Sequence, residues 1–401
     1  MKRILFLMFI ACLLAAAIFA GCKEDAPASL FDPSYVGGPP PVVTGILPPT
    51  DALANVTTLT ITGTNFVPDP ARNLVFFDKV SVPILQASAT QLVVKAPDLP
   101  KDSIIVKVSA GSDLFSSPVM YRLGLAADER FAGFGAADAP AAIECDTAGN
   151  LYVSMVAGTA GVGVKRIAPD GTRTDYSPIF SSAVDRWRGM KFGPRQAMFA
   201  VQGRNIIFRI PPGGGAPRLW LSGRGMTALN DLDFDSEGNM YAAGAATANI
   251  FRIRPDSVVQ AFPFVGTVRS VRVFSGYLYV AGNRDLIEKV WRFPISTGGI
   301  LGAEEEYFVY SSTTAVINAI TFSAAGDMFV GTTGTDAMLI VHPNKSVEIF
   351  YPGVLVKETG ALAWGKGRHL FQARVGTPGP ANVIRIDTQM EGAPYYGRLL
   401  P

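Results

Sequence analysis

The stretch LNDLDFDSEGNMYAAG, residues 229–244, concentrates the side chains that could bind a metal ion, with three aspartates at alternate positions and then a glutamate. Ca²⁺ prefers such closely spaced oxygen ligands. A calcium loop of the EF-hand type needs glycine at its sixth position and glutamate at its twelfth, and counted from Asp231 these positions hold Ser236 and Ala242. We therefore expect no metal site in this stretch.

A structural role explains Asp235 instead. It matches Asp146 and Ser323 in two similar stretches, AIECDTAGNLYVS (142–154) and AITFSAAGDMFVG (319–331), where each residue precedes a turn that contains glycine. Aspartate and serine side chains favour such turns because they bond to the backbone two residues further on. The sequence predicts that Asp235 shapes a hairpin turn.

Nucleophilic chemistry has few candidates in this chain. Its cysteines are Cys12, Cys22 and Cys145, and its only histidines are His342 and His369. Cys145 lies in a strand-like pattern, where a lone cysteine is usually a small buried hydrophobe rather than a nucleophile. We predict no catalytic residues and no cofactor.

Composition narrows the classes of partner. The chain has 401 residues, 48% of them hydrophobic and 17% charged, which is typical of ordered globular protein with more than one core. Lys and Arg number 35 against 33 Asp and Glu, and no basic run could follow a phosphate backbone. Nucleic acid is not an expected partner.

The N-terminus predicts export and a lipid anchor. Lys2 and Arg3 precede an apolar run and then FAGC, residues 19–22. This ending resembles the bacterial lipobox, although Phe19 stands where leucine is usual. The resemblance implies a signal peptide over residues 1–21 and lipidation at Cys22; an uncleaved membrane anchor is the alternative.

The location of the protein follows from that anchor. KED, residues 23–25, resembles the signal that exports lipoproteins of Bacteroidota to the outer face of the outer membrane. An ordinary solvated tether explains these charges equally well. We expect a lipid-anchored outer-membrane protein, at the cell surface or at the periplasmic face, with the membrane as a partner through Cys22.

Two folded regions follow a flexible tether at residues 22–41, which is rich in proline and glycine. Residues 42–123 contain short alternating runs, separated by turn residues, that predict an immunoglobulin-like β-sandwich. The segments LTITGTNF (59–66), VVKAP (93–97) and IIVKVSAG (104–111) resemble an IPT/TIG domain. Such domains usually position or join other domains, and we expect a scaffold role here.

Residues 124–401 contain six copies of one hairpin pattern. The residues just before the hairpins are separated by 47, 42, 39, 49 and 42 positions, and they are Ala141, Arg188, Asn230, Arg269, Asn318 and Gly360. A period of about 40–45 residues with several short strands indicates a β-propeller. The sequence therefore predicts an all-β protein with a six-bladed propeller, closed by FAGFG (131–135) or APYYGRLL (393–400).

The repeats resemble propellers of the NHL and SMP-30/gluconolactonase type, because they lack the Trp-Asp pair of WD40 blades and FAGFG precedes the first hairpin. That resemblance implies a divalent metal at the channel mouth, held by acidic and asparagine side chains. Asn230-Asp231 and Asn318 match the family's pattern. Ala141 stands where an acid is wanted, and Arg188 and Arg269 would repel a cation.

The same positions also suit a binding site for a sugar, a carboxylate or an acidic glycan. Arginines and amides recognise carboxylates and sugar hydroxyls. The candidate binding residues at the channel mouth are Arg188, Asn230, Asp231, Arg269 and Asn318. In the alternative, these side chains only satisfy backbone groups and solvate the channel.

We therefore expect a non-enzymatic binding module of the cell envelope, with a surface glycan or small molecule as its ligand. The residues favour binding over catalysis without deciding between them. The alternatives are a metal-dependent hydrolase of the SMP-30/gluconolactonase type and a docking platform for another envelope protein.

Overall fold

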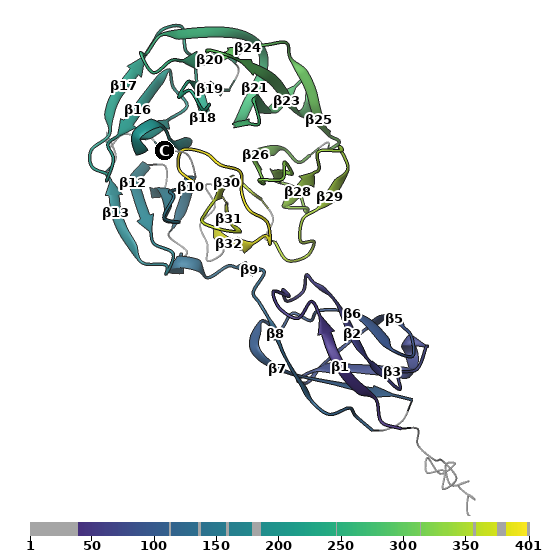
Figure 1. The fold of residues 1–401 in the computed structure, drawn as a ribbon. Helices are drawn as coiled ribbons and strands as arrows, with labels where there is room; N and C mark the ends of the chain where they lie inside the picture. The colour runs from purple at the N-terminus through teal and green to yellow at the C-terminus, as the bar shows by residue number, and fades with distance from the viewer. Residues whose placement is uncertain are drawn as a thin grey trace, which may run out of the picture.

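The computed structural model describes residues 39–398, apart from 112–113, 135–137, 158–159, 179–185, 246, 313, 356–357 and 375–381. The predicted signal peptide, Cys22 and all but the last residues of the tether lie outside the described residues. Strands dominate the described chain, and Figure 1 shows them in a small sandwich followed by a ring of sheets. No helix in this part of the chain is long and apolar enough to cross a bilayer.

The small domain is a sandwich of two four-stranded antiparallel sheets. Its core consists of inward-facing side chains from both sheets, such as Leu59, Ile61, Val75 and Phe77. The first sheet has the order β1-β2-β6-β5, with β1 Val42–Leu47, β2 Thr58–Thr64, β6 Gln91–Lys95 and β5 Ile84–Ala87. The second has the order β4-β3-β7-β8, with β4 Val80–Val82, β3 Asn73–Phe77, β7 Lys101–Ala110 and β8 Val119–Leu123.

The ring consists of six four-stranded blades, numbered here in chain order. Blade 1 is β10 Ala139–Cys145, β11 Leu151–Ala157, β12 Ala160–Ile167 and β13 Arg173–Ser177. Blade 2 is β14 Gly189–Phe192, β15 Met198–Val201, β16 Ile206–Ile210 and β17 Arg218–Ser222. Blade 3 begins with β18 Leu229–Phe234, β19 Met240–Gly244 and β20 Thr247–Ile253.

One 16-residue strand, β21 Val259–Phe274, completes blade 3 and continues as the innermost strand of blade 4. Blade 4 adds β22 Tyr277–Arg284, β23 Ile287–Ser296 and β25 Glu305–Tyr310, with the short β24 Ile300–Leu301 at its edge. Blade 5 is β26 Ile317–Phe322, β27 Met328–Thr332, β28 Met338–Val341 and β29 Val347–Ile349. The predicted sandwich followed by a six-bladed propeller is confirmed.

Blade 6 closes the ring with a strand from the other end of the propeller. Its sheet has the order β30-β31-β32-β9, with β30 Ala361–Trp364, β31 His369–Ala373, β32 Val383–Asp387 and β9 Ala127–Asp128. Neither segment predicted for this role supplies the strand. Phe131–Gly133 forms a 3₁₀ turn, and Gly135 lies outside the described residues. The prediction failed because β9 is only two residues long and has no alternating pattern to detect.

The described part of the C-terminal segment, residues 388–398, crosses one end of the central channel instead (Figure 1). The Tyr395 hydroxyl donates to Trp364 O in blade 6, and the Tyr396 hydroxyl donates to Ser236 O in blade 3, 3.2 Å away. The buried Arg398 donates to the carbonyl oxygens of Gly365, Gly367 and Gly392. This segment, called the strap below, ties several blades together.

The sandwich contacts blade 6 through a small polar junction. Arg368 pairs with Asp51 of the sandwich, 3.1 Å away, and with Asp387 of its own blade, 2.9 Å away. The backbone of Gly124, just after β8, exchanges hydrogen bonds with Ala52 and Ala54. Arg368 lies in the turn between β30 and β31, to which Arg398 of the strap also bonds, so this junction lies on the side of the strap.

Candidate functional site

The aspartate-rich hairpin between β18 and β19 is a bonded turn. Asp235 Oδ1 accepts from the backbone N–H groups of Glu237 and Asn239, at 3.0 and 2.8 Å, and Oδ2 accepts from the Asn239 amide and the Tyr241 hydroxyl. Asp146 makes three equivalent bonds in blade 1, accepting from the backbone N–H and the amide of Asn150 and from the Tyr152 hydroxyl. The carboxylate of Asp235 thus holds the turn together, as the sequence indicated.

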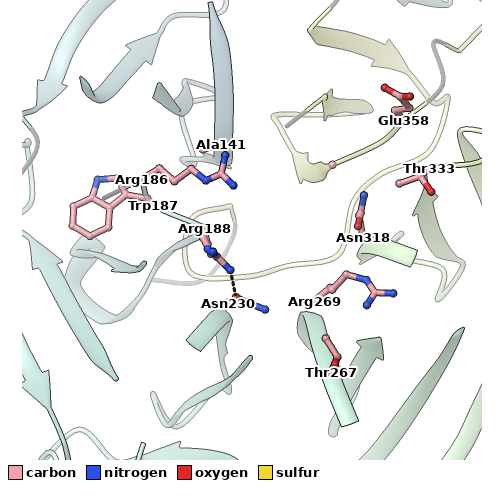
Figure 2. Close-up of a pocket in the computed structure, with 11 residues that line it drawn as sticks. Ala141, Arg186, Trp187, Arg188, Asn230, Thr267, Arg269, Asn318, Thr333 and Glu358 are labelled. Atoms are coloured by element: carbon pink, nitrogen blue, oxygen red, sulfur yellow. Dashed lines mark hydrogen bonds between the residues drawn. The ribbon is translucent and has the colours of Figure 1, made fainter. Parts of the chain in front are cut away.

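The end of the channel opposite the strap contains a cavity of about 520 Å³ (Figure 2). Every blade contributes to its wall through the residue that leads its first hairpin, and these six residues are Ala141, Arg188, Asn230, Arg269, Asn318 and Gly360. A constant position in each repeat becomes a ring of side chains because the blades circle one axis. Four of the five candidate binding residues lie in this ring.

β-Bulges turn these side chains toward the axis. In blade 4, Val268 pairs with Gly282 and Ser270 with Ala281, so Arg269 lies between them without a partner on the neighbouring strand. Ala141, Asn230 and Asn318 occupy the equivalent unpaired positions in blades 1, 3 and 5. An extra residue in one strand re-aims its side chain, and such bulges often occur beside functional sites.

The polar side chains at the mouth differ in how well they are satisfied. Arg188 is exposed, and its guanidinium donates to Asn230 Oδ1, 3.0 Å away (Figure 2). Asn230 donates in turn to Val268 O at 2.9 Å, and Asn318 donates to Thr359 O at 3.1 Å. Among the described residues no carboxylate forms an ion pair with Arg188, so its positive charge is available to a ligand.

Arg269 is held more firmly than Arg188. Its Nη2 pairs with Glu288 Oε1, and its Nε donates to Ile317 O at 2.8 Å. Glu288 is 4% exposed, and its other oxygen accepts from the Ile317 amide at 3.0 Å. The guanidinium therefore has a fixed position on the cavity wall, and a buried carboxylate beneath it offsets part of its charge.

Asp231 does not line this cavity. It is 7% exposed, and its Oδ2 accepts from the Ser270 hydroxyl at 3.1 Å, the Val271 amide at 3.0 Å and Arg272 at 2.8 Å. Successive side chains of a strand point to opposite faces, so Asp231 turns away where the bulged Asn230 turns inward. The structure thus places Asp231 in the layer below the mouth.

The channel below the mouth is filled by paired charges. Lys191 and Glu144 form an ion pair of 2.5 Å, and both side chains are buried. The pKa of the buried Arg272 is raised, mainly by Asp231 against the opposing effect of burial. Burial raises the pKa of Asp233 to about 6, although Lys191 and Arg272 act against this.

Beneath the mouth the free space is small, because the voids in these layers measure about 40 Å³ and about 20 Å³. Tyr395 of the strap lines the lower void together with Lys191, Asp233 and Arg272. A ligand in the 520 Å³ cavity therefore enters and leaves by the mouth.

Sequence reasoning missed four polar residues of the cavity, namely Arg186, Thr267, Thr333 and Glu358. Arg186 and Glu358 lie just before the first strand of their blades and Thr333 just after the second, where spacing varies between repeats, whereas Thr267 lies within β21. Arg186 and Thr267 each lie two positions before a predicted site residue, which was the available signal. Glu358 has a backbone φ of +73°, which sequence patterns do not reveal.

The tryptophans do not offer ring faces to a ligand. Trp187 lines the cavity but is 1% exposed, and its ring packs edge-to-face on Phe208 with centroids 5.2 Å apart. Trp364 is equally buried and packs on Phe329 at 5.4 Å. Both rings therefore belong to the blade packing.

Cys145 and the histidines form no catalytic device. Cys145 is fully buried, and burial raises the pKa of its thiol, which disfavours the reactive thiolate. His342 Nδ1 bonds to Asp327 at 2.7 Å, and the pKa of His369 is lowered mainly by burial. No described group of three or more His, Cys, Asp or Glu side chains could hold a metal ion.

Comparison with known families supports the sandwich. Residues 41–122 match the IPT/TIG domain model. This match covers the small domain alone. A comparison with curated protein sequences found no match.

Several solved structures share the fold of this chain. An auxiliary nutrient binding protein from Bacteroides thetaiotaomicron matches with a TM-score of 0.53 and 11% identity, over 89% of this chain and 98% of that chain. One from Bacteroides ovatus matches with a TM-score of 0.50 and 13% identity, over 89% and 99%. A gluconolactonase from Xanthomonas campestris matches with a TM-score of 0.50 and 16% identity, over 63% and 87%. At these identities the likeness concerns the fold.

Proposed function

We propose that this protein is a binding module that holds a small carboxylate-bearing ligand, a sugar acid or the acidic end of a glycan, in the mouth cavity. The observation that carries the proposal is the set of arginines on its wall, Arg186, Arg188 and Arg269, around a space of about 520 Å³. Pockets of this size hold small ligands, and the planar guanidinium matches a carboxylate with two parallel hydrogen bonds.

The amides complete the recognition. The Arg188 guanidinium is positioned by Asn230, and the Asn318 amide nitrogen donates to a backbone carbonyl, which leaves the amide oxygen of Asn318 as an acceptor for sugar hydroxyls. Polar groups that hold one another in place lose little freedom when a ligand binds. The mouth therefore combines a charged clamp with preorganised neutral partners.

A metal-dependent hydrolase of the gluconolactonase type is the second candidate, favoured by the propeller likeness and by Asn230-Asp231 and Asn318. The charges of the channel oppose it. Asp231 is bonded to Arg272 and Glu144 to Lys191, so these two carboxylates already have cationic partners. A divalent ion at Asp231 would be repelled by Arg272 and by Arg269. Binding without catalysis fits these contacts better.

Docking of another envelope protein is supported by the sandwich rather than the propeller. The outer face of the sheet β4-β3-β7-β8 exposes large apolar side chains, with Leu74 at 51%, Ile105 at 41% and Met120 at 57%. Exposed apolar patches often mark protein contacts. Cross-linking of cells that carry Met120→Glu, compared with wild type, tests this role: loss of a cross-linked species supports it.

The address of the protein remains part of the proposal. Lipidation at Cys22 would hold the tether, sandwich and propeller at the outer membrane, with the mouth on the side away from the sandwich junction. Metabolic labelling with palmitate tests this directly. We expect the wild type to be labelled and the Cys22→Ala variant to remain unlabelled. Label in both proteins would contradict lipidation at Cys22.

Calorimetric titration of the full chain, purified in mild detergent, tests the ligand. We expect D-galacturonic acid to bind and D-galactose, which lacks the carboxylate, to bind at least about tenfold more weakly, since a hydrogen bond to a charged group contributes about 1.5–3 kcal/mol. Arg188→Ala should weaken the acid alone. Arg209→Ala, an exposed arginine on the same blade outside the cavity, is the matched control. Equal binding of both sugars would contradict the proposal.

A further inference from the structure

Among the described residues that line it, the mouth cavity carries one carboxylate beside its arginines. Glu358 lies just before blade 6, and Figure 2 shows it across the cavity from Arg188 and Asn230, with Asn318 and Thr333 between it and Arg269. The wall therefore carries arginines on the side of blades 2 and 4 and a carboxylate on the side of blade 6. This asymmetry goes beyond what an anion clamp requires.

Glu358 is only partly engaged by the protein. Its Oε2 lies 3.3 Å from Arg374 Nη2, its side chain is 49% exposed, and no described residue donates to Oε1. Its backbone has a φ of +73°, a conformation that costs a residue with a side chain about 1 kcal/mol or more. A carboxylate inside an anion-binding cavity also repels the ligand's charge. Both penalties are understandable if the carboxylate accepts hydrogen bonds from the ligand.

We propose that Glu358 is a specificity-determining residue, which accepts hydrogen bonds from hydroxyl groups at the end of the ligand opposite its carboxylate. The inference rests on the proposed function, because it assumes that the carboxylate lies against Arg188 and Arg269. The ligand class is then a polyhydroxylated acid rather than any small carboxylate. Because the channel below the mouth is filled, such a ligand is held within the cavity and does not thread through the propeller.

Two probes of equal charge separate this role from general electrostatics. D-Galacturonic acid carries a carboxylate and hydroxyls on a six-membered ring, whereas cyclohexanecarboxylate carries the carboxylate alone. Loss of Glu358 removes an acceptor needed by the first probe and a repulsive charge felt by both. The proposal therefore predicts changes of opposite sign for the two probes.

The experiment is calorimetric titration of the full chain and its variants with both probes. In the wild type we expect galacturonic acid to bind about tenfold or more tightly than cyclohexanecarboxylate. Glu358→Ala should weaken galacturonic acid by about tenfold and strengthen cyclohexanecarboxylate by about twofold. Glu358→Gln, which keeps the shape of the side chain, should shift both probes in the same directions by less. Glu348→Gln, at an exposed glutamate outside the cavity, should change neither.

A rise in affinity for both probes when Glu358 is replaced would overturn the role of Glu358 and leave the anion site intact. Unchanged affinities would do the same. Absence of binding of either probe to the wild type would overturn the proposed function, and the role of Glu358 with it.

Discussion

The mouth of the propeller and the middle of its channel are built from the same six inner strands, yet the two regions differ in how their charged side chains are partnered. In the middle, Lys191 is paired with Glu144 and Arg272 with Asp231, and all four side chains are largely shielded from solvent. At the mouth, Arg188 has an amide for its partner. The pairs in the middle hold the blades together, whereas the unpaired charge at the mouth is free for a ligand. Position along one strand thus separates a structural from a recognition role.

The largest effect should come from breaking a pair in the middle. Lys191→Met leaves the buried Glu144 without its counter-charge, and loss of one partner of a buried pair costs about 3–5 kcal/mol. Denaturant unfolding followed by tryptophan fluorescence measures this, because all four tryptophans lie in the propeller. The double variant Glu144→Gln, Lys191→Met should recover most of the loss. A loss below about 1 kcal/mol in the single variant would contradict the structural role.

Arg269 tests the boundary between the two regions, since it lines the cavity and also pairs with the buried Glu288. We expect Arg269→Ala to lower the free energy of unfolding by about 2–4 kcal/mol and to weaken galacturonic acid as well. Arg188→Ala should weaken the ligand while stability changes by less than about 0.5 kcal/mol. Equal stability losses in the two variants would contradict the view that Arg269 supports the fold and Arg188 does not.

Asp233 gives the middle of the channel a measurable pH dependence. Its pKa rises from 3.8 to about 6 on folding, so the folded state binds the proton more tightly than the unfolded state. Asp233 therefore stabilises the fold below about pH 4, and this contribution is lost as the pH rises to about 6; the shift corresponds to about 3 kcal/mol. The stability of wild type minus that of Asp233→Asn, measured by denaturant at pH 4 and pH 7, should be larger at pH 4. A difference that does not vary with pH would show that Asp233 does not titrate there.

The smallest expected effect concerns salt. Raising NaCl from about 50 to 500 mM should weaken galacturonic acid about two- to fivefold, because exposed charges at the mouth are screened. The stability lost in Lys191→Met should change little over the same range, since buried pairs are screened much less. Similar salt dependence in both measurements would show that charges at the mouth and in the middle of the channel are screened to the same extent.

The repeat period predicted which residues line the mouth, because one position in the repeat recurs once in each of the six blades. Arg188, Asn230, Arg269 and Asn318 could be placed together without any structure, since equivalent residues of equivalent blades face one axis. The depth of Asp231 could not be predicted, because the bulge at Asn230 changes which side chain faces the axis. Glu358 could not be predicted as a cavity residue, because it lies in an irregular segment and has a positive φ. The closing strand β9 could not be predicted, because two residues carry no periodic pattern.

The closing strand has a consequence for biosynthesis. Ala127 pairs with Ile386, and the two residues are 259 positions apart in the chain. In a partial chain, β9 has no partner strand until β32, Val383–Asp387, has been synthesised. The ring can therefore close only once β32 has been made, and shorter chains would present unpaired β-edges to quality-control proteases.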